Sequence, residues 1–391
     1  MTTLWATILV LGVLIFIHEL GHFFAARSVG VRVDRFSIGF PPRLITFTSE
    51  NDGWRLRIFF YRRGIEGRIN WGPVYEKQVV KPGKQGSGTE YCAALLPIGG
   101  YVKMAGLIDE SLDDTIEHTP DELASKHPLA QAWVMSAGVI MNVLLAWFLF
   151  SAVAWKTGLP EISDEPVIAE FVPDMPAEDS GLKKNDRILA VNGESFSTWQ
   201  EMSERIHGLA DTDLILTVQR ENKKFDLPIH SGSQVVIREG VKDTLGAIGI
   251  YPRVTYTPIG PGQAVAAGVR STANGFAMIF MSIKMLATGE ASFKEMGGPI
   301  FIAQMAGETA KAGWTPLLAF MALISINLAF LNILPIPGLD GGHILVTLIQ
   351  VIIRRELSLR VRVIIQQIGM AFLLLLMITI MYNDIGRLLG N

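Results

Sequence analysis

Four stretches of this chain are apolar over a length that fits a lipid bilayer, and polar or charged segments separate them. A helix needs about 20 consecutive apolar residues to cross a hydrocarbon core of about 30 Å. The stretches that meet this requirement cover residues 4–26, 130–155, 317–334 and 363–382. The pattern therefore predicts an α-helical polytopic membrane protein with four transmembrane helices.

The polar segment after the first apolar stretch shows the two-residue alternation of β-strands. Residues 54–60 read Trp-Arg-Leu-Arg-Ile-Phe-Phe, and residues 31–38 and 91–96 carry similar signals between glycines and prolines. We expect a small antiparallel sheet beside the membrane, and we assign no function to its basic, strand-like residues 50–86. A solvated acidic connector follows within residues 107–128, formed by Asp109, Glu110, Asp113, Asp114, Glu117, Asp121 and Glu122.

Charge sets the expected orientation of the helices, because basic residues favour the cytoplasmic side of a membrane. Arg27, Arg32 and Arg35 follow the first apolar stretch, whereas no charged side chain precedes it. The N-terminus is therefore expected outside the cytoplasm. Residues 158–258 hold 17 acidic and 10 basic residues, a difference of −7, which predicts a soluble domain outside the cytoplasm.

Composition agrees with a multi-span membrane protein that carries soluble parts, since 49% of the 391 residues are hydrophobic. The formal charge of −3 says little about partners, and we expect no nucleic acid among them. The single cysteine, Cys92, excludes an intrachain disulfide framework and a zinc site made of cysteines. We expect Cys92 to serve in packing.

A His-Glu-x-x-His motif lies inside the first apolar stretch, at His18, Glu19 and His22. Histidines four residues apart share one face of a helix, where both imidazoles can reach a single Zn²⁺ ion. Glu19 is rotated from that face and can accept a proton from water at the metal. A histidine pair at this spacing is often only structural, but ionisable groups inside lipid need an ion, a cavity or a partner. The motif therefore predicts an intramembrane zinc site.

A catalytic zinc site needs about three protein ligands, so the motif alone lacks one. Asp340 follows the third apolar stretch, after two prolines and between glycines. A helix must break there, and the backbone can turn a carboxylate inward. Two alternatives stay open at this point: Asp340 can be an ordinary turn residue, and His343 can compete as the ligand.

Residues 262–287 form a further apolar segment, which Arg270 and Lys284 bracket closely. Whether this segment crosses the membrane determines the side of the membrane on which Asp340 lies. If this segment crossed the membrane, the next span would deliver Asp340 to the side opposite the histidines. We therefore predict an amphipathic or interfacial helix there. This choice also keeps the basic cluster in the cytoplasm, as the charge rule requires; its members are Arg354, Arg355, Arg360 and Arg362.

Several segments, in the same order, resemble the site-2 protease family of intramembrane zinc metalloproteases, in particular its bacterial regulator-of-sigma-E protease branch. They are HELGH at 18–22, FSIGF at 36–40, GTEY at 88–91 with LPIGGYVKM at 96–104, and NILPIPGLDGGH at 332–343. The resemblance implies that His18, His22 and Asp340 bind zinc and that Glu19 is the general base. It also implies that Asn327 and Asn332 help hold substrate near the metal.

The soluble block resembles a PDZ domain of this branch in residues 176–182, 185–188 and 191–194. The best-known members carry two such domains in tandem, whereas about 100 residues fit only one. A second departure is Gly138-Val139, where the family motif has Gly-Pro before Asn142, a residue that we expect to face the bundle interior. The resemblance implies one extracytoplasmic PDZ domain of α+β type, which would bind an envelope protein or a peptide.

The predicted organisation has eight consecutive parts. They are a transmembrane helix with HELGH (1–26), a cytoplasmic-side, membrane-associated β region with the acidic connector (27–129), a second transmembrane helix (130–157), the periplasmic PDZ domain (158–258), amphipathic or interfacial helices (259–314), a third transmembrane helix with the Leu-Asp-Gly motif (315–345), a basic cytoplasmic loop (346–362) and a fourth transmembrane helix with a short tail (363–391). Both termini are then periplasmic, and the active site lies toward the cytoplasmic side of a bacterial inner membrane.

The expected reaction is zinc-dependent hydrolysis of a peptide bond within or at the edge of the bilayer. The resemblance implies single-span membrane proteins as substrates, such as anti-sigma factors after a first cut or remnant signal peptides. A non-enzymatic membrane scaffold with a structural zinc is the alternative, although such a site has no need of a base like Glu19. A zinc transporter would need a polar path through several spans, and the second to fourth spans carry almost no ionisable groups.

Overall fold

The computed structural model describes residues 2–63, 69–83, 85–107, 118–238, 241–292 and 297–389. The chain forms two compact units, which we describe separately. Unit 1 combines Met1–Val153 with Pro261–Asn391, and unit 2 is Ala154–Gly260. Of the predicted acidic connector, Asp109, Glu110, Asp113, Asp114 and Glu117 lie outside the described residues. Asp121 lies inside them and pairs with Arg32 at 2.6 Å.

Four helices of the described chain are long and apolar enough to cross a membrane, and all belong largely to unit 1. They are α1 (Thr2–Ser28), α2 (Pro128–Thr157), α7 (Trp314–Ile333) and α9 (Leu359–Leu388). The number and places of these helices confirm the four apolar stretches read from the sequence. Val10, Leu14 and Ile326 are fully buried in the cluster where α1, α2 and α7 pack.

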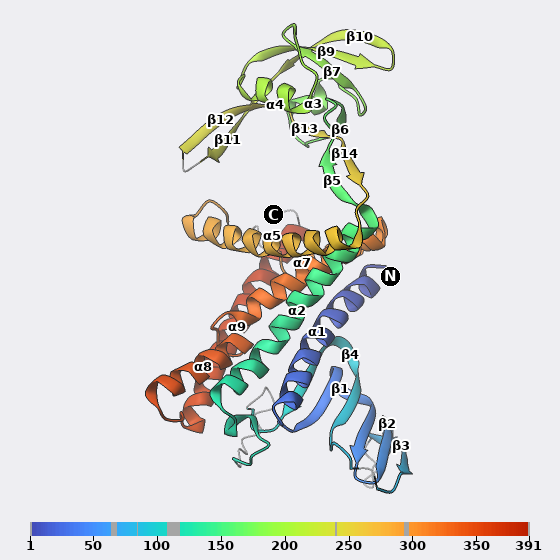
Figure 1. The fold of residues 1–391 in the computed structure, drawn as a ribbon, viewed down its shortest axis with the longest axis vertical. Coiled ribbons are helices and arrows are strands. Elements are labelled where there is room, and N and C mark those ends of the chain that lie inside the picture. Colours follow the sequence, from blue (N-terminus) through green and yellow to red (C-terminus); the bar gives the residue numbers. More distant parts are fainter. Residues whose placement is uncertain are drawn as a thin grey trace. The chain divides into compact units, whose positions relative to one another are not determined.

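Helix α5 (Pro261–Thr288) covers the predicted interfacial segment and runs across α2 and α7 rather than alongside them (Figure 1). Small residues form its buried face: Ala264, Gly268, Thr272 and Gly275. A Cβ at Gly268 would collide with Ser151 of α2, and one at Gly275 would lie 2.5 Å from Ile326 of α7. These glycines let α5 pack closely on both helices.

A carboxylate of α9 closes the N-terminal end of α6 (Pro299–Ala312). Asp384 is 3% exposed and accepts hydrogen bonds from the backbone N–H groups of Gly298, Ile300 and Phe301, at 2.9, 2.9 and 3.1 Å. The first N–H groups of a helix have no partner within it, so a charged acceptor there stabilises the helix end. Asp384 therefore ties α9 to α6.

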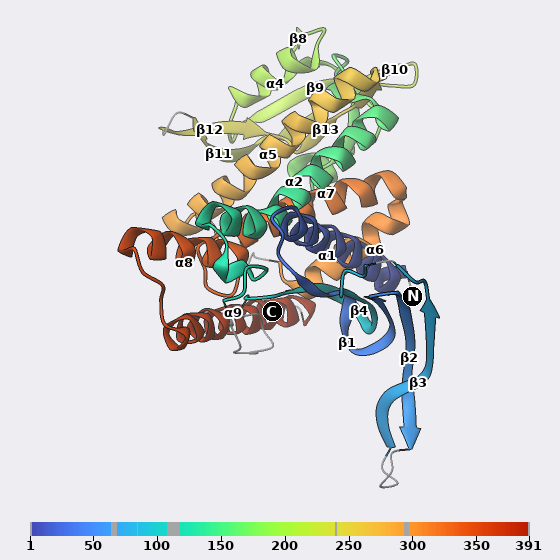
Figure 2. The ribbon, with the colours of Figure 1, turned by 60° about the horizontal axis from the view of Figure 1, so that its bottom comes forward.

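The predicted antiparallel sheet is present in unit 1, with strand order β3-β2-β1-β4. Its strands are β1 (Val33–Glu50), β2 (Gly53–Arg63), β3 (Ile69–Val80) and β4 (Glu90–Met104). β4 pairs with β1 twice, because Phe36 aligns with both Tyr91 and Val102. Of the unassigned residues 50–86, residues 64–68 and 84 lie outside the described ones, and 53–63 and 69–80 are the paired strands β2 and β3, which project from the rest of unit 1 (Figure 2).

An aromatic cluster fastens α1 to this sheet. Phe23 of α1 contacts Phe36 of β1 and Tyr91 of β4, with ring centroids 5.2 and 6.0 Å apart. Cys92 is also buried in the sheet, as a packing residue should be. The 3₁₀ turn η1 (Leu123–Ser125) then leads into α2.

One predicted boundary near Asp340 is wrong. The third apolar stretch, 317–334, matches α7, which ends at Ile333, but residues 346–362 do not form one loop, because a separate helix, α8, spans Asp340–Ile353. Two prolines at 335 and 337 stop α7, and the apolar residues after His343 continue at helical spacing. Only residues 354–358 connect α8 to α9.

Unit 2 mixes short strands with two helices around one core. A four-stranded antiparallel sheet has the order β10-β9-β7-β8, and three strand pairs accompany it: β13 with β6, β14 with β5, and β11 with β12. The elements are β5 (Leu159–Ile162), β6 (Ile168–Phe171), α3 (Pro176–Asp179), β7 (Arg187–Val191), β8 (Glu194–Ser195), α4 (Trp199–His207), β9 (Asp213–Arg220), β10 (Lys223–His230), β11 (Gly232–Arg238), β12 (Val241–Ala247), β13 (Ile250–Pro252) and β14 (Val254–Thr257).

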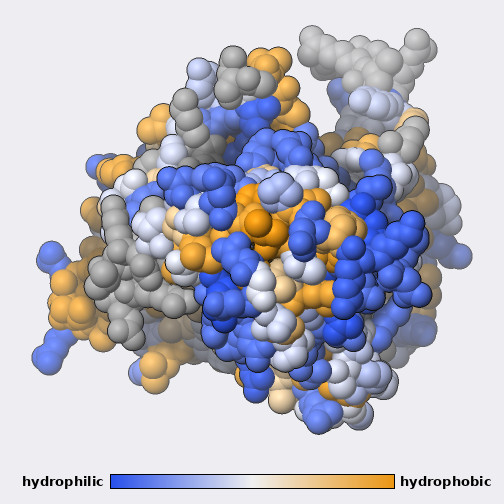
Figure 3. All heavy atoms as spheres, turned by 90° about the horizontal axis from the view of Figure 1, so that it is seen from above, coloured by the Kyte–Doolittle hydropathy of each residue, from blue (hydrophilic) through white to orange (hydrophobic). Residues whose placement is uncertain are grey.

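The core of unit 2 includes Ile188, Leu216 and Val218, each fully buried. Figure 3 shows mainly hydrophilic residues on the face of unit 2 that is turned to the viewer, around a small hydrophobic patch. Such a surface suits a soluble domain rather than a lipid-facing one.

Candidate metal centre

Helix α1 presents His18 and His22 on one buried face, as their spacing predicts. The two residues are 7% and 5% exposed, and their Nε2 atoms lie 3.2 Å apart. Asp340 comes from the first turn of α8, and its Oδ2 atom lies 3.2 Å from Nε2 of His18 and 3.3 Å from Nε2 of His22. Three groups from distant parts of the sequence thus converge on one point.

Helix α2 holds the other nitrogen of each imidazole. His22 Nδ1 lies 2.8 Å from the carbonyl oxygen of Val134, so this nitrogen carries the proton and donates it. His18 Nδ1 lies 3.2 Å from the side-chain amide of Asn142, which is fully buried. The atom at this distance is Asn142 Nδ2; exchanging the nitrogen and oxygen of the amide would turn Oδ1, which has no partner, toward His18, where it would accept an Nδ1 proton. Both Nε2 lone pairs then face Asp340.

The close approach of α2 depends on a residue without a side chain. A Cβ at Gly138 would lie 2.5 Å from His18 Cε1 and 2.5 Å from His22 Nε2. Val134, Gly138 and Asn142 recur every four residues and so form one stripe on α2. This stripe faces the two histidines of α1 in register.

A tight turn between α7 and α8 aims the aspartate at the histidines. Glycines at 341 and 342 let the start of α8 pack against the backbone carbonyls of residues 333–336, which any Cβ there would strike. Asp340 Oδ2 is buried but has no hydrogen-bond partner. A buried carboxylate oxygen without a partner is costly unless a cation or a donor occupies the space it faces.

The donor set fits a zinc ion. Among the described residues, His18, His22 and Asp340 form the group whose ligand atoms all lie within 4.8 Å of one another. Two neutral imidazoles and one carboxylate are a usual ligand set for catalytic zinc, with a fourth position left for water or substrate. The unpaired Oδ2 atom and the two fixed Nε2 lone pairs point into the same space.

Glu19 lies beside this group and against the sheet. Its carboxyl group lies near the backbone of Val102 in β4, and its Cγ atom would lie 3.6 Å from a Cβ at Gly100. The carboxylate that can move a proton is therefore placed between the donor set and β4.

The two predicted substrate-holding asparagines have different surroundings. Asn332 near the end of α7 places its Nδ2 atom 3.3 Å from His18 Nε2, so it reaches the donor set. Asn327 is exposed, and its side chain donates to the carbonyl of Leu323 in its own helix at 3.2 Å. The structure brings Asn332 to the centre and leaves Asn327 away from it.

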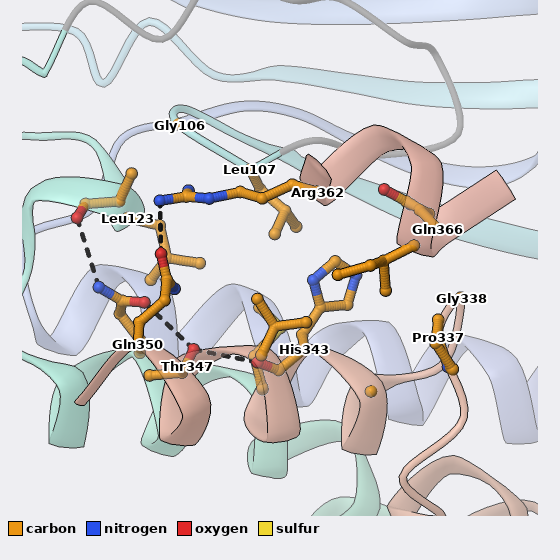
Figure 4. Close-up of a pocket in the computed structure, with 16 residues that line it drawn as sticks. Gly106, Leu107, Leu123, Pro337, Gly338, His343, Thr347, Gln350, Arg362 and Gln366 are labelled. Carbon is orange, nitrogen blue, oxygen red and sulfur yellow. Dashed lines mark hydrogen bonds between the residues drawn. The ribbon is translucent and has the colours of Figure 1, made fainter. Parts of the chain in front are cut away.

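His343 does not belong to the group of convergent ligand atoms. Its side chain points into a separate cavity of about 70 Å³ between α2, α8 and α9 (Figure 4). Thr347, Gln350 and Arg362 also line this cavity. The geometry thus favours Asp340 over His343 as the third ligand.

The groups that hold the imidazoles were missed by the sequence reading. We expected Asn142 in the bundle interior but named no partner for it, and we expected the small residues at 137 and 138 to permit close helix approach without naming the histidines as what they approach. Their spacing to Val134 was the available signal, since a polar residue and a glycine four apart on an apolar helix face one neighbour. The role of Val134 could not be predicted from its side chain, because its backbone carbonyl is the group that contacts His22.

Comparisons with known proteins identify the class of enzyme. The sequence matches peptidase family M50 over residues 6–65 and 77–376. A Campylobacter jejuni protein named as a zinc metalloprotease is 34% identical over 99% of this chain and 94% of its own length. The regulator of sigma-W protease RasP of Bacillus subtilis is 29% identical over 99% of both chains. An Agrobacterium fabrum protein, also named as a zinc metalloprotease, is 30% identical over 98% of this chain and 95% of its own.

Two solved PDZ-domain structures match a small part of the chain. The PDZ domain of an SdrC-like protein of Listeria innocua covers 23% of it, at 23% identity and a TM-score of 0.19. Over nearly its whole length the sequence instead shares its ancestry with the metalloproteases, which favours an enzyme over the scaffold and transporter alternatives. The chain belongs to peptidase family M50, the site-2 proteases, and is a zinc metalloprotease of the membrane.

Proposed function

We propose that this protein is an intramembrane endopeptidase in which His18, His22 and Asp340 hold zinc and Glu19 is the general base. One observation carries the proposal: the Nε2 atoms of two histidines on a membrane-length apolar helix meet Asp340 Oδ2 at 3.2 and 3.3 Å, with Glu19 next to them. Ionisable groups inside a span are costly unless they serve an ion or a reaction.

The residues divide the work as follows. When bound here, zinc activates water and polarises the carbonyl of the scissile peptide bond. Glu19 accepts the proton of that water and then passes it to the departing amine, so water adds across one C–N bond. Val134 and Asn142 keep the imidazole protons on Nδ1. Asn332 lies where its amide can donate to the substrate carbonyl.

A transmembrane substrate must first lose its helical hydrogen bonds, because they occupy the carbonyls to be attacked. The second half of β4 offers a place for the opened segment, since Glu19 lies near Gly100 and Val102 there. Residues 100–104 pair with β1 on one side. Within the described chain no strand pairs with their other side, so that edge can accept an extended peptide by strand addition.

Unit 2 is proposed to be a PDZ domain that selects what reaches the centre. Its short strands, the turns at Asn185 and Asn192 with positive φ, and its hydrophilic face support this assignment. An envelope protein or a peptide is the proposed partner. A single domain in place of two would give a simpler filter.

The proposed location is a bacterial inner membrane, with both termini and unit 2 in the periplasm and the centre toward the cytoplasm. Within unit 1, the N-terminal end of α1 and the C-terminal end of α9 lie at the same end, and α8 lies at the other (Figure 1). Cysteines placed near residue 200 should be labelled by an impermeant reagent from outside, and those near residue 357 only after the membrane is opened. The reverse pattern would overturn this orientation.

Single-span membrane proteins are the proposed substrates, with anti-sigma factors after a first cut and remnant signal peptides as the leading classes. The relationship to a regulator of sigma-W protease supports the first class. The test is a comparison of membrane-protein fragments in cells that carry wild type or Glu19→Gln. Glu19→Gln should lose cleavage by about 10²- to 10⁴-fold and keep its zinc, because the amide has the same shape but accepts no proton. Undiminished cleavage with full zinc would show that Glu19 is not the base.

A further inference from the structure

A basic pocket of about 350 Å³ opens at the end of unit 1 that lies away from the N-terminal end of α1. The start of α2, the end of α8 and the start of α9 form it. Its charged lining consists of Lys126, Arg354, Arg355, Arg362 and Glu356. Four cations against one anion give this pocket an excess of three positive charges, which suits an anionic ligand.

Two of the arginines pair with no other side chain among the described residues. Arg362 is held in place, since it donates to Gln350 Oε1 at 2.7 Å and pairs with Glu356 at 3.3 Å (Figure 4). Arg354 and Arg355 are exposed, and no side-chain partner is found for either among the described residues. Glu356 therefore offsets Arg362, and the pocket presents Arg354, Arg355 and Lys126 to a ligand.

The helices that form the pocket also carry exposed apolar side chains, which we call its apolar rim. Val351 lines the pocket itself, and the exposed apolar residues near the lining in sequence are Leu129 on α2 and Leu348, Ile352 and Ile353 on α8. Leu129 is 75% exposed and Ile352 is 70% exposed. A ligand that fits both features carries an anionic head and a long apolar part.

We propose that this pocket binds the phosphate group of an anionic phospholipid, whose acyl chains lie along Leu129 and the outer face of α8. Clusters of basic residues between membrane helices take anionic head groups in this way. A free phosphate or a nucleotide would use the cations but leave the apolar rim in water. The same helix carries Asp340 in its first turn and the pocket at its last, so a bound lipid would hold α8 in place.

The proposal needs only that the chain resides in a membrane, and it is independent of the assigned catalytic roles. Purified full-length protein is transferred to nanodiscs of phosphatidylcholine, and phosphatidylglycerol binding is then measured by native mass spectrometry over a titration. Lys126→Gln and Arg355→Gln should each weaken binding about fivefold, since a basic residue near an anionic head contributes about 1 kcal/mol. Arg360→Gln is the control, because it removes the same charge from the same segment outside the pocket.

Three results would overturn the proposal. An equal loss for Arg360→Gln would mean a general charge effect, and unchanged binding in both pocket variants would place the lipid elsewhere. If inorganic phosphate displaces phosphatidylglycerol from the wild type at a concentration 10-fold below that of the lipid, the pocket is a site for free phosphate. Thermal unfolding of each variant in phosphatidylcholine alone checks that the fold is unchanged. Cleavage is not measured, so failure here leaves the proposed protease function intact.

Discussion

The two sides of the metal centre are built by different means. His18 and His22 lie on one long helix, and α2 holds each through its second nitrogen, at 3.2 and 2.8 Å. Asp340 lies on a short helix after a turn, and its Oδ2 atom has no hydrogen-bond partner. Below we call these the histidine side and the aspartate side.

The difference concerns what keeps each ligand in position. On the histidine side, the stripe of Val134, Gly138 and Asn142 fixes tautomer and orientation before any metal arrives, as hydrogen bonds to metal-binding histidines generally do. On the aspartate side, the backbone turn brings Oδ2 to 3.2 and 3.3 Å from the two Nε2 atoms, but no hydrogen bond holds that oxygen. We infer that hydrogen bonds fix the histidine side in advance, whereas a bound metal would be needed to fix the aspartate side.

The largest effect is expected from removing the charge on the aspartate side. Asp340→Asn should weaken zinc binding by more than about 100-fold, beyond the roughly 10- to 100-fold typical of losing an outer hydrogen bond, because a neutral amide is a poor zinc ligand. Zinc content is measured after dialysis against graded chelator, with Glu19→Gln and His343→Ala as variants that should keep zinc. If His343→Ala loses zinc and Asp340→Asn keeps it, the aspartate side has been assigned to the wrong residue.

A smaller loss is expected from the histidine side. Asn142→Leu should lower zinc affinity about 10- to 100-fold, since His18 then loses the acceptor that fixes its tautomer. Asn142→Asp keeps an acceptor and should restore most of the affinity, which a purely structural role for Asn142 does not predict. The d–d absorption of Co²⁺-substituted protein reports ligand geometry without turnover. Identical spectra and affinities for the leucine variant would remove Asn142 from the histidine side.

The smallest effect should come from packing alone. Gly138→Ala places a methyl group 2.5 Å from both imidazoles and should cost about 1–3 kcal/mol of stability through overpacking. Gly386→Ala in α9 is the matched control, because its Cβ meets nothing within 4 Å and alanine is the better helix former. Thermal unfolding in one detergent compares them. Equal midpoints would mean that α1 and α2 do not approach as closely as described.

Local patterns were enough to predict most of unit 1. Apolar length located the four long helices, alternation located the sheet, and helical spacing placed His18 and His22 together. The turn around Asp340 was harder to predict, because two prolines indicate the end of α7 but not the start of α8 seven residues later. Contacts between distant segments stayed invisible, since nothing in the local sequence joins Asn142 to His18 or Asp384 to the start of α6.

The structural role of Gly369 in α9 predicts a pattern of conservation that sequence comparison alone can test. A Cβ at this position would collide with the carbonyl of Pro337, in the turn that leads to Asp340. Selection on the turn therefore extends to a residue on an otherwise lipid-exposed helix, where side chains usually vary freely. Relatives that keep the proline turn should keep glycine here over evolutionary time, while neighbours of Gly369 on the outer face of α9 drift among apolar residues.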